Sequence, residues 1–456
     1  MRKLLFYTVT LLCAICILDS CKENEGVESL PPEISIKQPK VFPASGGKQS
    51  IPYTINDLLE GVMLEADTQT DWITDLSVNE KSVSFRISEN KSTKERQGSI
   101  TLYYQEAESV SVKIKQEGIS TTSLDKNGTA NCYIISEPGT YQFPVVKGNS
   151  DKPAGPVSSV EVLWETFGTD TAPEKGDLIQ KVSYASNMII FTTAAEFKKG
   201  NALIAARDES GKILWSWHIW FTDKPEEQVY LNDAGTMMDR NLGATSATPG
   251  EAGALGLLYQ WGRKDPFLSS SKITGRSAAK ATIDFNLAKS DASTGTIDYA
   301  IANPTTFITS NNSDWYYFEG NEGKDNSRWT RNKTIYDPCP PGYRVPDGGS
   351  DGVWSKALNW DLTSRITNNM YDITNIGSNF SSSKGSNAFS DAENCWYPMV
   401  GRRDQSGNIA LNNPTTYWAC SPSASGSTLL ITDKILVLTF QHMTVTGNPV
   451  RCQKEQ

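Results

Sequence analysis

Three stretches of sequence decide the fold of this chain: MDRNLGA (residues 238–244), GLLYQWGRKDPF (residues 256–267) and DPCPPGYRVP (residues 337–346). Each mixes Gly, Pro, aromatic and charged residues in a way that suits neither a regular helix nor a regular strand. Gly256 and Gly262 permit backbone conformations that a Cβ atom would forbid. The stretches therefore predict a loop-rich domain whose backbone is fixed at special positions.

Charged residues in these stretches lie next to one another along the chain. We expect Asp239 with Arg240, and Arg263 with Asp265, to pair or hydrogen-bond locally and to hold long loops without regular ladders. The prolines beside Cys339 fix an extended turn. The same residues that break regular structure are thus predicted to form the frame of the domain.

Taken in this order, the three stretches resemble the Fibrobacter succinogenes major paralogous domain family, which is related to the C-type-lectin-like and formylglycine-generating-enzyme folds. The resemblance covers residues 229–456 and implies a loop-rich α+β, C-type-lectin-like domain. It also implies a disulfide between Cys339 and Cys452.

Five cysteines follow Cys21, so at least one stays free or pairs between molecules. Their wide spacing excludes the paired cysteines of a zinc site, and disulfides are the better interpretation for an exported chain. We assign Cys395 and Cys420 to a second bridge, which leaves Cys132 as a buried thiol on a strand.

Residues 34–118 show the period-two alternation of a β-sandwich, and residues 99–103 and 110–115 predict a hairpin. The segment resembles the BACON domain, an immunoglobulin-like sandwich, through Trp72, residues 85–87, Asn90, Arg96, Gly98 and residues 112–116. The family name reflects a suspected carbohydrate-binding role. We favour a spacer in which Trp72 packs in the core over a module in which it stacks on a sugar.

Residues 127–227 predict a second sandwich, because short apolar stretches are separated by Gly, Pro and Asn. In ILWSWHIWF (residues 213–221), Trp215, Trp217, Ile219 and Phe221 share one face of a strand, and Ser216, His218 and Trp220 share the other. We expect the first set to fill the sandwich core, Trp220 to pack against a neighbouring domain, and His218 to be structural. The predicted fold class is mostly β: two immunoglobulin-like β-sandwiches followed by a loop-rich α+β C-type-lectin-like domain.

Residues 1–20 predict a signal peptide, since a charged start precedes a short apolar run. The run ends at Cys21 in a stretch that resembles the lipobox of bacterial lipoproteins, which implies lipidation of Cys21 and an outer-membrane anchor. Residues 21–33 form a linker whose acidic start resembles the surface-export signal of Bacteroidetes lipoproteins. We therefore expect a surface-exposed protein.

Chemical motifs are scarce. The net charge of −9 and the absence of a basic stripe exclude nucleic acid as a partner. His218 and His442 lie in different modules, and no nucleophile elbow or phosphate loop occurs. We expect no enzyme activity and no cofactor, although a structural calcium ion is compatible with the sequence. The alternative is a polysaccharide-active hydrolase with two facing carboxylates.

Aromatic residues gather in a polar stretch at Trp315, Tyr316, Tyr317 and Trp329. Such loops resemble adaptable binding surfaces, so we assign these four residues to ligand binding. The opposing interpretation is that each one plugs the core beneath its loop.

The order of anchor, sandwiches and loop-rich head is similar to that of fimbria-associated lipoproteins of Bacteroidetes. The resemblance implies an adhesin-like head that binds a glycan, a host surface protein or pilus subunits. The alternative is a structural pilus anchor or tip subunit without a ligand of its own.

Overall fold

The computed structural model describes residues 30–318, 327–360, 366–410, 414–420 and 426–456. Cys21 and the predicted signal segment lie outside these residues. The described chain is mostly β, as predicted, and its two α-helices are short. None of its helices is long and apolar enough to cross a membrane. The chain divides into two compact units, one that ends at Gly118 and one from Ile119 to Gln456, to which residues 91–93 are also assigned.

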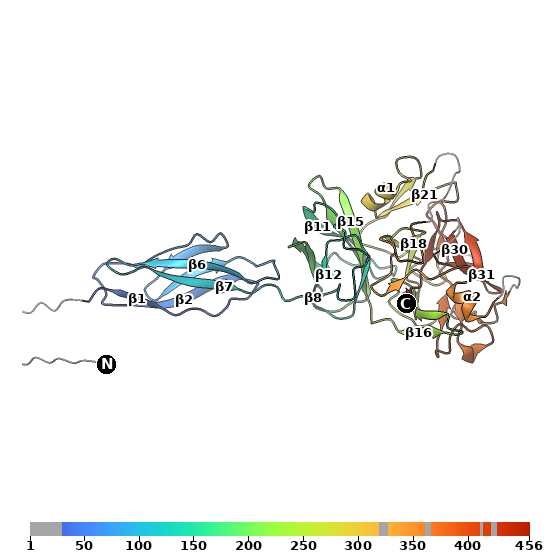
Figure 1. Ribbon diagram of the computed structural model, residues 1–456, viewed down its shortest axis with the longest axis horizontal. Coiled ribbons are helices and arrows are strands. Elements are labelled where there is room, and N and C mark those ends of the chain that lie inside the picture. Colours follow the sequence, from blue (N-terminus) through green and yellow to red (C-terminus); the bar gives the residue numbers. More distant parts are fainter. Residues whose placement is uncertain (1–29, 319–326, 361–365, 411–413, 421–425) are drawn as a thin grey trace, which may run out of the picture. The chain divides into compact units, whose positions relative to one another are not determined.

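The first unit is a sandwich of two antiparallel sheets (Figure 1). One sheet has the order β1 (Glu33–Ile36), β2 (Gly47–Asn56), β5 (Ser82–Ile87), β4 (Ile73–Val78). The other has the order β3 (Glu65–Asp67), β6 (Arg96–Tyr103), β7 (Val110–Gln116). The predicted hairpin is β6–β7. Trp72 is half-buried against the core, and the Arg96 guanidinium lies 4.5 Å from its ring centroid. The packing role predicted for Trp72 is confirmed.

The second unit begins with another sandwich (Figure 1). One sheet has the order β12 (Ile179–Ala185), β13 (Met188–Thr193), β10 (Thr140–Pro144), β8 (Thr122–Ser123). The other has the order β11 (Ser159–Thr166), β14 (Gly200–Arg207), β15 (Ile213–Phe221), β9 (Cys132–Ile135). The predicted division of β15 into two faces is confirmed, because its first set of apolar side chains belongs to the core between these sheets: Trp215, Trp217, Ile219 and Phe221.

The opposite face of β15 is buried as well. Trp220 is fully buried in a cluster shared with Met238, Leu242 and Trp261 of the C-terminal part. Its indole Nε1 donates to the carbonyl of Ala244 at 2.9 Å. The second sandwich and the C-terminal part therefore share a core, and the predicted boundary near residue 228 does not separate two compact units.

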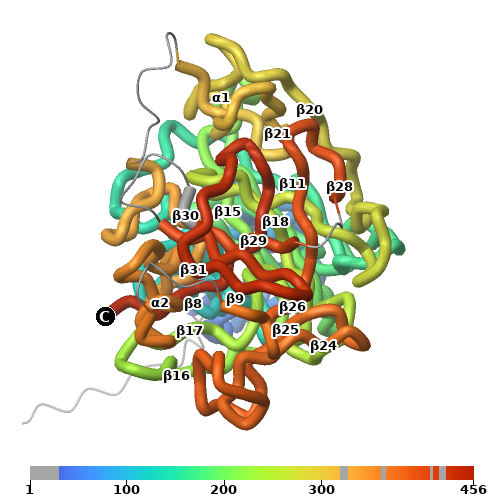
Figure 2. Tube along the Cα trace, turned by 90° about the vertical axis from the view of Figure 1, so that its right-hand side faces the viewer, coloured from blue at the N-terminus to red at the C-terminus, as the bar shows by residue number. Residues whose placement is uncertain are grey.

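The C-terminal part consists of short strands joined by long loops. Two sheets hold the first and last strands of this part: one has the order β16 (Glu227–Tyr230), β17 (Gly235–Met238), β33 (Gln453–Lys454), β22 (Tyr343–Arg344), and the other β19 (Phe267–Leu268), β18 (Leu257–Gln260), β32 (Gly447–Pro449), β27 (Arg402–Arg403), β28 (Ile409–Ala410). A further sheet has the order β23 (Ile366–Thr367), β31 (Ile435–His442), β30 (Gly426–Ile431), β29 (Thr415–Trp418). Two small sheets pair β20 (Asn286–Lys289) with β21 (Thr306–Thr309), and β24 (Tyr371–Asp372) with β25 (Gly377–Asn379) and β26 (Trp396–Pro398). The helices are α1 (Ile297–Ala302) and α2 (Val353–Ala357), with 3-10 turns at Ala252–Ala254 and Ser382–Lys384. Figure 2 shows β29, β30 and β31 side by side, with α2 next to β31.

The three stretches form the predicted frame by packing on one another and on the last strands. The Leu257 amide donates to the carbonyl of Leu242, and the Leu242 amide donates to the carbonyl of Val450. Gly256 has a φ of 71°, and a Cβ atom there would lie 2.8 Å from the Leu242 carbonyl oxygen. Gly262 has a φ of 81°, and its Cβ would lie 2.6 Å from the Cβ of Arg328. Both glycines are therefore required by conformation and by space.

The Cys339–Cys452 disulfide is present and closes this frame from start to end. The two cysteines are 113 residues apart, so the chain-entropy model assigns the bridge a stabilisation of roughly 4–5 kcal/mol. Asp337 fixes the turn next to it by accepting hydrogen bonds from the amides of Cys339 and Val345.

Local pairing or hydrogen bonding is confirmed for all four residues, but Arg263 and Asp265 do not pair with each other. Asp239 and Arg240 form a buried two-point ion pair with both distances 2.9 Å. Asp265 instead pairs with Lys264 at 2.7 Å, and both contact Ser216 on β15. Arg263 donates to Gln260 and to backbone carbonyls. Asp265 pairs with Lys264 because both side chains extend toward Ser216 on the sandwich. The Arg263 side chain extends toward Gln260 and Thr306 in the C-terminal part instead.

We expect residues 119–456 to fold alone and residues 229–456 not to fold alone. Removing the sandwich would expose the apolar cluster around Trp220, and exposed apolar surface of this kind destabilises the folded state. Limited proteolysis and urea unfolding of the two fragments measure this. A cooperative unfolding transition of the 229–456 fragment would contradict the shared core.

We expect Lys264→Met to lower the free energy of unfolding of residues 119–456 by about 3–5 kcal/mol, because Asp265 then stays buried without its cation. Adding Asp265→Asn removes the unpaired charge and restores part of the loss. Urea denaturation of both variants measures the difference. A loss below about 1 kcal/mol for the single change would mean that the pair is not needed here.

Candidate functional site

The two tryptophans of the predicted aromatic binding surface are buried. Trp315 and Trp329 are only 1% and 0% exposed. Their indole nitrogens donate to the carbonyls of Trp261 and Tyr336, each at 2.9 Å. The assignment of Trp315 and Trp329 to ligand binding is wrong, because both plug the core below their loops. Tyr316 is half-buried, and Tyr317 is 38% exposed.

A buried ion pair explains why these aromatic residues turn inward. Arg328 and Asp314 are both buried and pair at 2.8 Å. The Arg328 guanidinium carbon lies 5.1 Å and 4.7 Å from the ring centroids of Trp261 and Trp315. Aromatic faces and one carboxylate thus replace water around this cation. The contact of the Arg328 guanidinium with the Trp261 and Trp315 rings could not be predicted from the sequence.

The two histidines are not placed for catalysis. His218 is buried on β15, and its Nε2 lies 2.9 Å from Oδ1 of Asn201. Burial lowers the pKa of His218 to about 3, so it is neutral at ordinary pH. Burial also lowers the pKa of His442 to about 4. The structural role predicted for His218 is confirmed.

The predicted bridge between Cys395 and Cys420 is wrong, because both are free thiols in separate places. Cys395 lies near the hydroxyl of Tyr230 in one core cluster, and Cys420 lies near Asp347 in another. Burial raises the pKa of Cys395 to about 11 and that of Cys420 to about 12. The expected buried strand thiol at Cys132 is confirmed.

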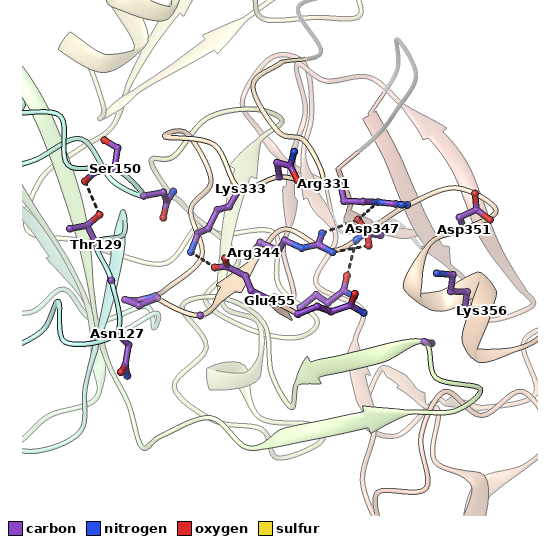
Figure 3. Close-up of a pocket in the computed structure, with 18 residues that line it drawn as sticks. Asn127, Thr129, Ser150, Arg331, Lys333, Arg344, Asp347, Asp351, Lys356 and Glu455 are labelled. Carbon is purple, nitrogen blue, oxygen red and sulfur yellow. Dashed lines mark hydrogen bonds and ion pairs between the residues drawn. The ribbon is translucent and has the colours of Figure 1, made fainter.

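The best-formed candidate site is a polar cleft of about 800 Å³ in the second unit (Figure 3). One wall comes from the sandwich loops around Asn127, Thr129 and Ser150. The opposite side comes from the turn at residues 331–333, the third stretch, Asp351 just before α2, and Lys356 in the last turn of α2. We call this feature the junction cleft, because the sandwich and the C-terminal part both contribute to it.

Two asparagines hold the walls of the junction cleft together. The Asn131 amide donates to the carbonyls of Ile335 and Asp337 at 2.7 and 2.8 Å. The Asn149 amide donates to the carbonyls of Thr334 and Asp337 at 2.6 and 3.2 Å. Because one amide group bridges two carbonyls in each case, the turn beside Asp337 is fixed to the sandwich.

Two acidic side chains in the junction cleft are already paired. Asp347 accepts from both terminal nitrogens of Arg344 at 2.9 and 2.7 Å and from Nε of Arg331 at 3.2 Å. Burial opposes ionisation of Asp347, but the Arg344 guanidinium outweighs burial and holds its pKa below the usual value. Glu455 pairs with Lys333 at 3.2 Å. A carboxylate held ionised in this way is a poor general acid at neutral pH, so the hydrolase alternative gains no support from Asp347.

The junction cleft is suited to hydrogen bonding and charge recognition. None of its lining residues, all of which are described, carries an aromatic ring. Within the described residues, no group of three or more His, Cys, Asp or Glu side chains is arranged to hold a metal ion. Arg344 belongs to the third stretch, which sequence reasoning treated only as part of the frame, and Asp347 directly follows that stretch. No sequence signal could have found the site, because its walls come from segments far apart in the chain.

No protein-family model and no curated protein matches the chain. Among solved structures it is similar to a Bacteroides ovatus GH5 xyloglucanase in complex with a XXXG heptasaccharide, at 20% identity over 23% of this chain and 21% of that one, with a TM-score of 0.17. A three-Ig-domain fragment of titin is 12% identical over 44% of this chain and 67% of that one, also with a TM-score of 0.17. The chain thus spans about a fifth of the xyloglucanase's length, and likenesses this distant carry no argument about function.

We expect a thiol reagent to label no cysteine of the folded 119–456 fragment and three cysteines after unfolding without reductant. The three are the buried thiols Cys132, Cys395 and Cys420, since Cys339 and Cys452 are bridged. Mass spectrometry after labelling measures the count. A single labelled cysteine in the unfolded fragment would instead support the predicted bridge between Cys395 and Cys420.

Proposed function

We propose that the protein is an exported surface lipoprotein whose second unit binds a glycan in the junction cleft. The single observation that carries the proposal is the cleft itself, which is large, open and lined mostly by polar side chains. The first unit then serves as a spacer between the lipid anchor at Cys21 and the binding unit.

A hydroxyl-rich ligand fits the lining better than an apolar one. Side-chain amides of Asn127 and Asn332 and hydroxyls of Thr129 and Ser150 line the junction cleft. Amides and hydroxyls both donate and accept, and so do the hydroxyl groups of a sugar. The usual small-molecule pocket is predominantly apolar. The lining therefore favours a saccharide of several residues over an apolar metabolite.

The buried tryptophans change where binding is proposed, not the class of function. With Trp315 and Trp329 in the core, stacking of a sugar on those rings is excluded. The proposal therefore moves the binding surface of the adhesin-like head from the aromatic loop to the junction cleft. Binding of a pilus subunit or a host protein remains the alternative occupant of the same head.

We expect the full-length protein to retain a glycan on an array, and Asn127→Ala combined with Asn332→Ala to weaken this binding about tenfold. Both side chains are exposed, so the loss of hydrogen bonds to the ligand should exceed any loss of stability. Asn311→Ala with Asn312→Ala is a matched control outside the cleft. Absence of any retained glycan, or equal weakening by the control, would contradict the proposal.

A further inference from the structure

The junction cleft holds more cationic hydrogen-bonding capacity than its own carboxylates use. Four cationic side chains line it against three carboxylates: Arg331, Lys333, Arg344 and Lys356 against Asp347, Asp351 and Glu455. The chain as a whole carries a net charge of −9. The side chains that line the cleft therefore carry one more positive than negative charge, although the chain as a whole is acidic.

Two of these cations are committed to the walls. Arg344 is buried and binds Asp347 through both terminal nitrogens. Lys333 has a side chain only 9% exposed and binds Glu455 and the carbonyl of Pro340. Because both are held by the protein, neither is free to bind a ligand without breaking these contacts.

The other two cations face solvent. Arg331 has a side chain 63% exposed and uses only Nε for Asp347, so its two terminal nitrogens keep their donors. Lys356, on α2, is exposed and has no ion pair or side-chain hydrogen bond with any described residue. Figure 3 shows Arg331 above the cleft and Lys356 at its α2 end. In the same view both side chains lie on the side of the cleft that also holds Asp347 and Asp351, away from Thr129 and Ser150.

Among the three carboxylates, Asp351 alone is unpaired within the described residues, since Asp347 and Glu455 are held by Arg344 and Lys333. Lys356, which is unpaired, and the terminal nitrogens of Arg331, which the Asp347 contact leaves open, therefore face one unpaired carboxylate. Charge-assisted hydrogen bonds are roughly twice as strong as neutral ones, and the planar edge of an arginine matches a carboxylate with two parallel bonds. A carboxylate or sulfate on the ligand would gain an ion pair and parallel hydrogen bonds, whereas a hydroxyl group would gain single hydrogen bonds without the ion pair.

We infer that the saccharide bound in the junction cleft is acidic, and that Arg331 and Lys356 hold its carboxylate or sulfate group. The inference rests on the proposed function, because it names the class of glycan that the same cleft binds. Asn127, Thr129 and Ser150 on the sandwich wall then contact the neighbouring hydroxyl groups. Asp351 opposes the acidic group and limits the affinity.

The test measures binding of the full-length protein to tetragalacturonate, to its neutral methyl ester and to a sulfated carrageenan tetrasaccharide by calorimetry. We expect at least one acidic probe to bind about tenfold or more tightly than the ester. A preference for tetragalacturonate would assign a planar carboxylate, and a preference for carrageenan a sulfate. Raising NaCl from about 0.05 M to about 0.5 M should weaken only the acidic probe, since screening acts on charge.

Matched variants separate the cleft from general charge. Arg331→Gln and Lys356→Gln should each weaken the acidic probe about tenfold and leave the ester unchanged. Asp351→Asn should strengthen it severalfold, and Lys434→Gln, an exposed lysine outside the cleft, should have no effect. Unchanged melting temperatures would show that the variants fold.

Failure of the inference and of the proposed function give different results. Equal binding of the ester and the acidic probes, or loss of binding by Lys434→Gln to the same extent as by Arg331→Gln, overturns the inference and leaves glycan binding intact. Absence of binding by every probe, together with an empty glycan array, overturns both.

Discussion

Burial of both faces of β15 is the constraint on which the second unit depends. A strand with aromatic residues on both faces cannot leave one of them in water, since each large side chain contributes about 1.5–3 kcal/mol when buried. Trp215, Trp217 and Phe221 fill the sandwich core, and Trp220 requires a second layer. The C-terminal part supplies that layer with the first and second sequence stretches. Ser216 and His218 share the face of β15 that carries Trp220, and each finds a buried polar partner.

The junction cleft follows from this union. Its walls belong to two parts of the chain that a reader of the sequence would place in separate domains. Asn131 joins them most directly, because its side chain accepts from Trp215 in the sandwich and donates to the turn beside Asp337. A ligand site built across such a junction is pre-organised by the packing of both parts, so little ordering is needed when a ligand binds.

Charges in this unit serve two distinct purposes. Buried pairs such as Arg328 with Asp314 and Lys264 with Asp265 hold loops that lack regular ladders. Arg451 is also buried, but an aromatic ring faces its charge: its guanidinium carbon lies 3.7 Å from the ring centroid of Tyr397. Exposed cations such as Arg331 and Lys356 are the ones to which we assign ligand recognition. The same residue types therefore act as frame or as site according to whether their hydrogen bonds are satisfied within the protein.

The sequence by itself determined the β-rich class, the two faces of β15, the frame glycines and the Cys339–Cys452 bridge, because these depend on local periodicity, backbone conformation or a resemblance carried by long stretches. It also indicated that Trp220 would be covered, since an aromatic outer face needs a partner. Only the tertiary structure decided that Trp315 and Trp329 are core, that Cys395 and Cys420 lie apart, and that Lys264 rather than Arg263 pairs with Asp265. The junction cleft likewise came only from the structure. Each of these depends on distances between segments far apart in the chain, which no pattern of neighbouring residues encodes.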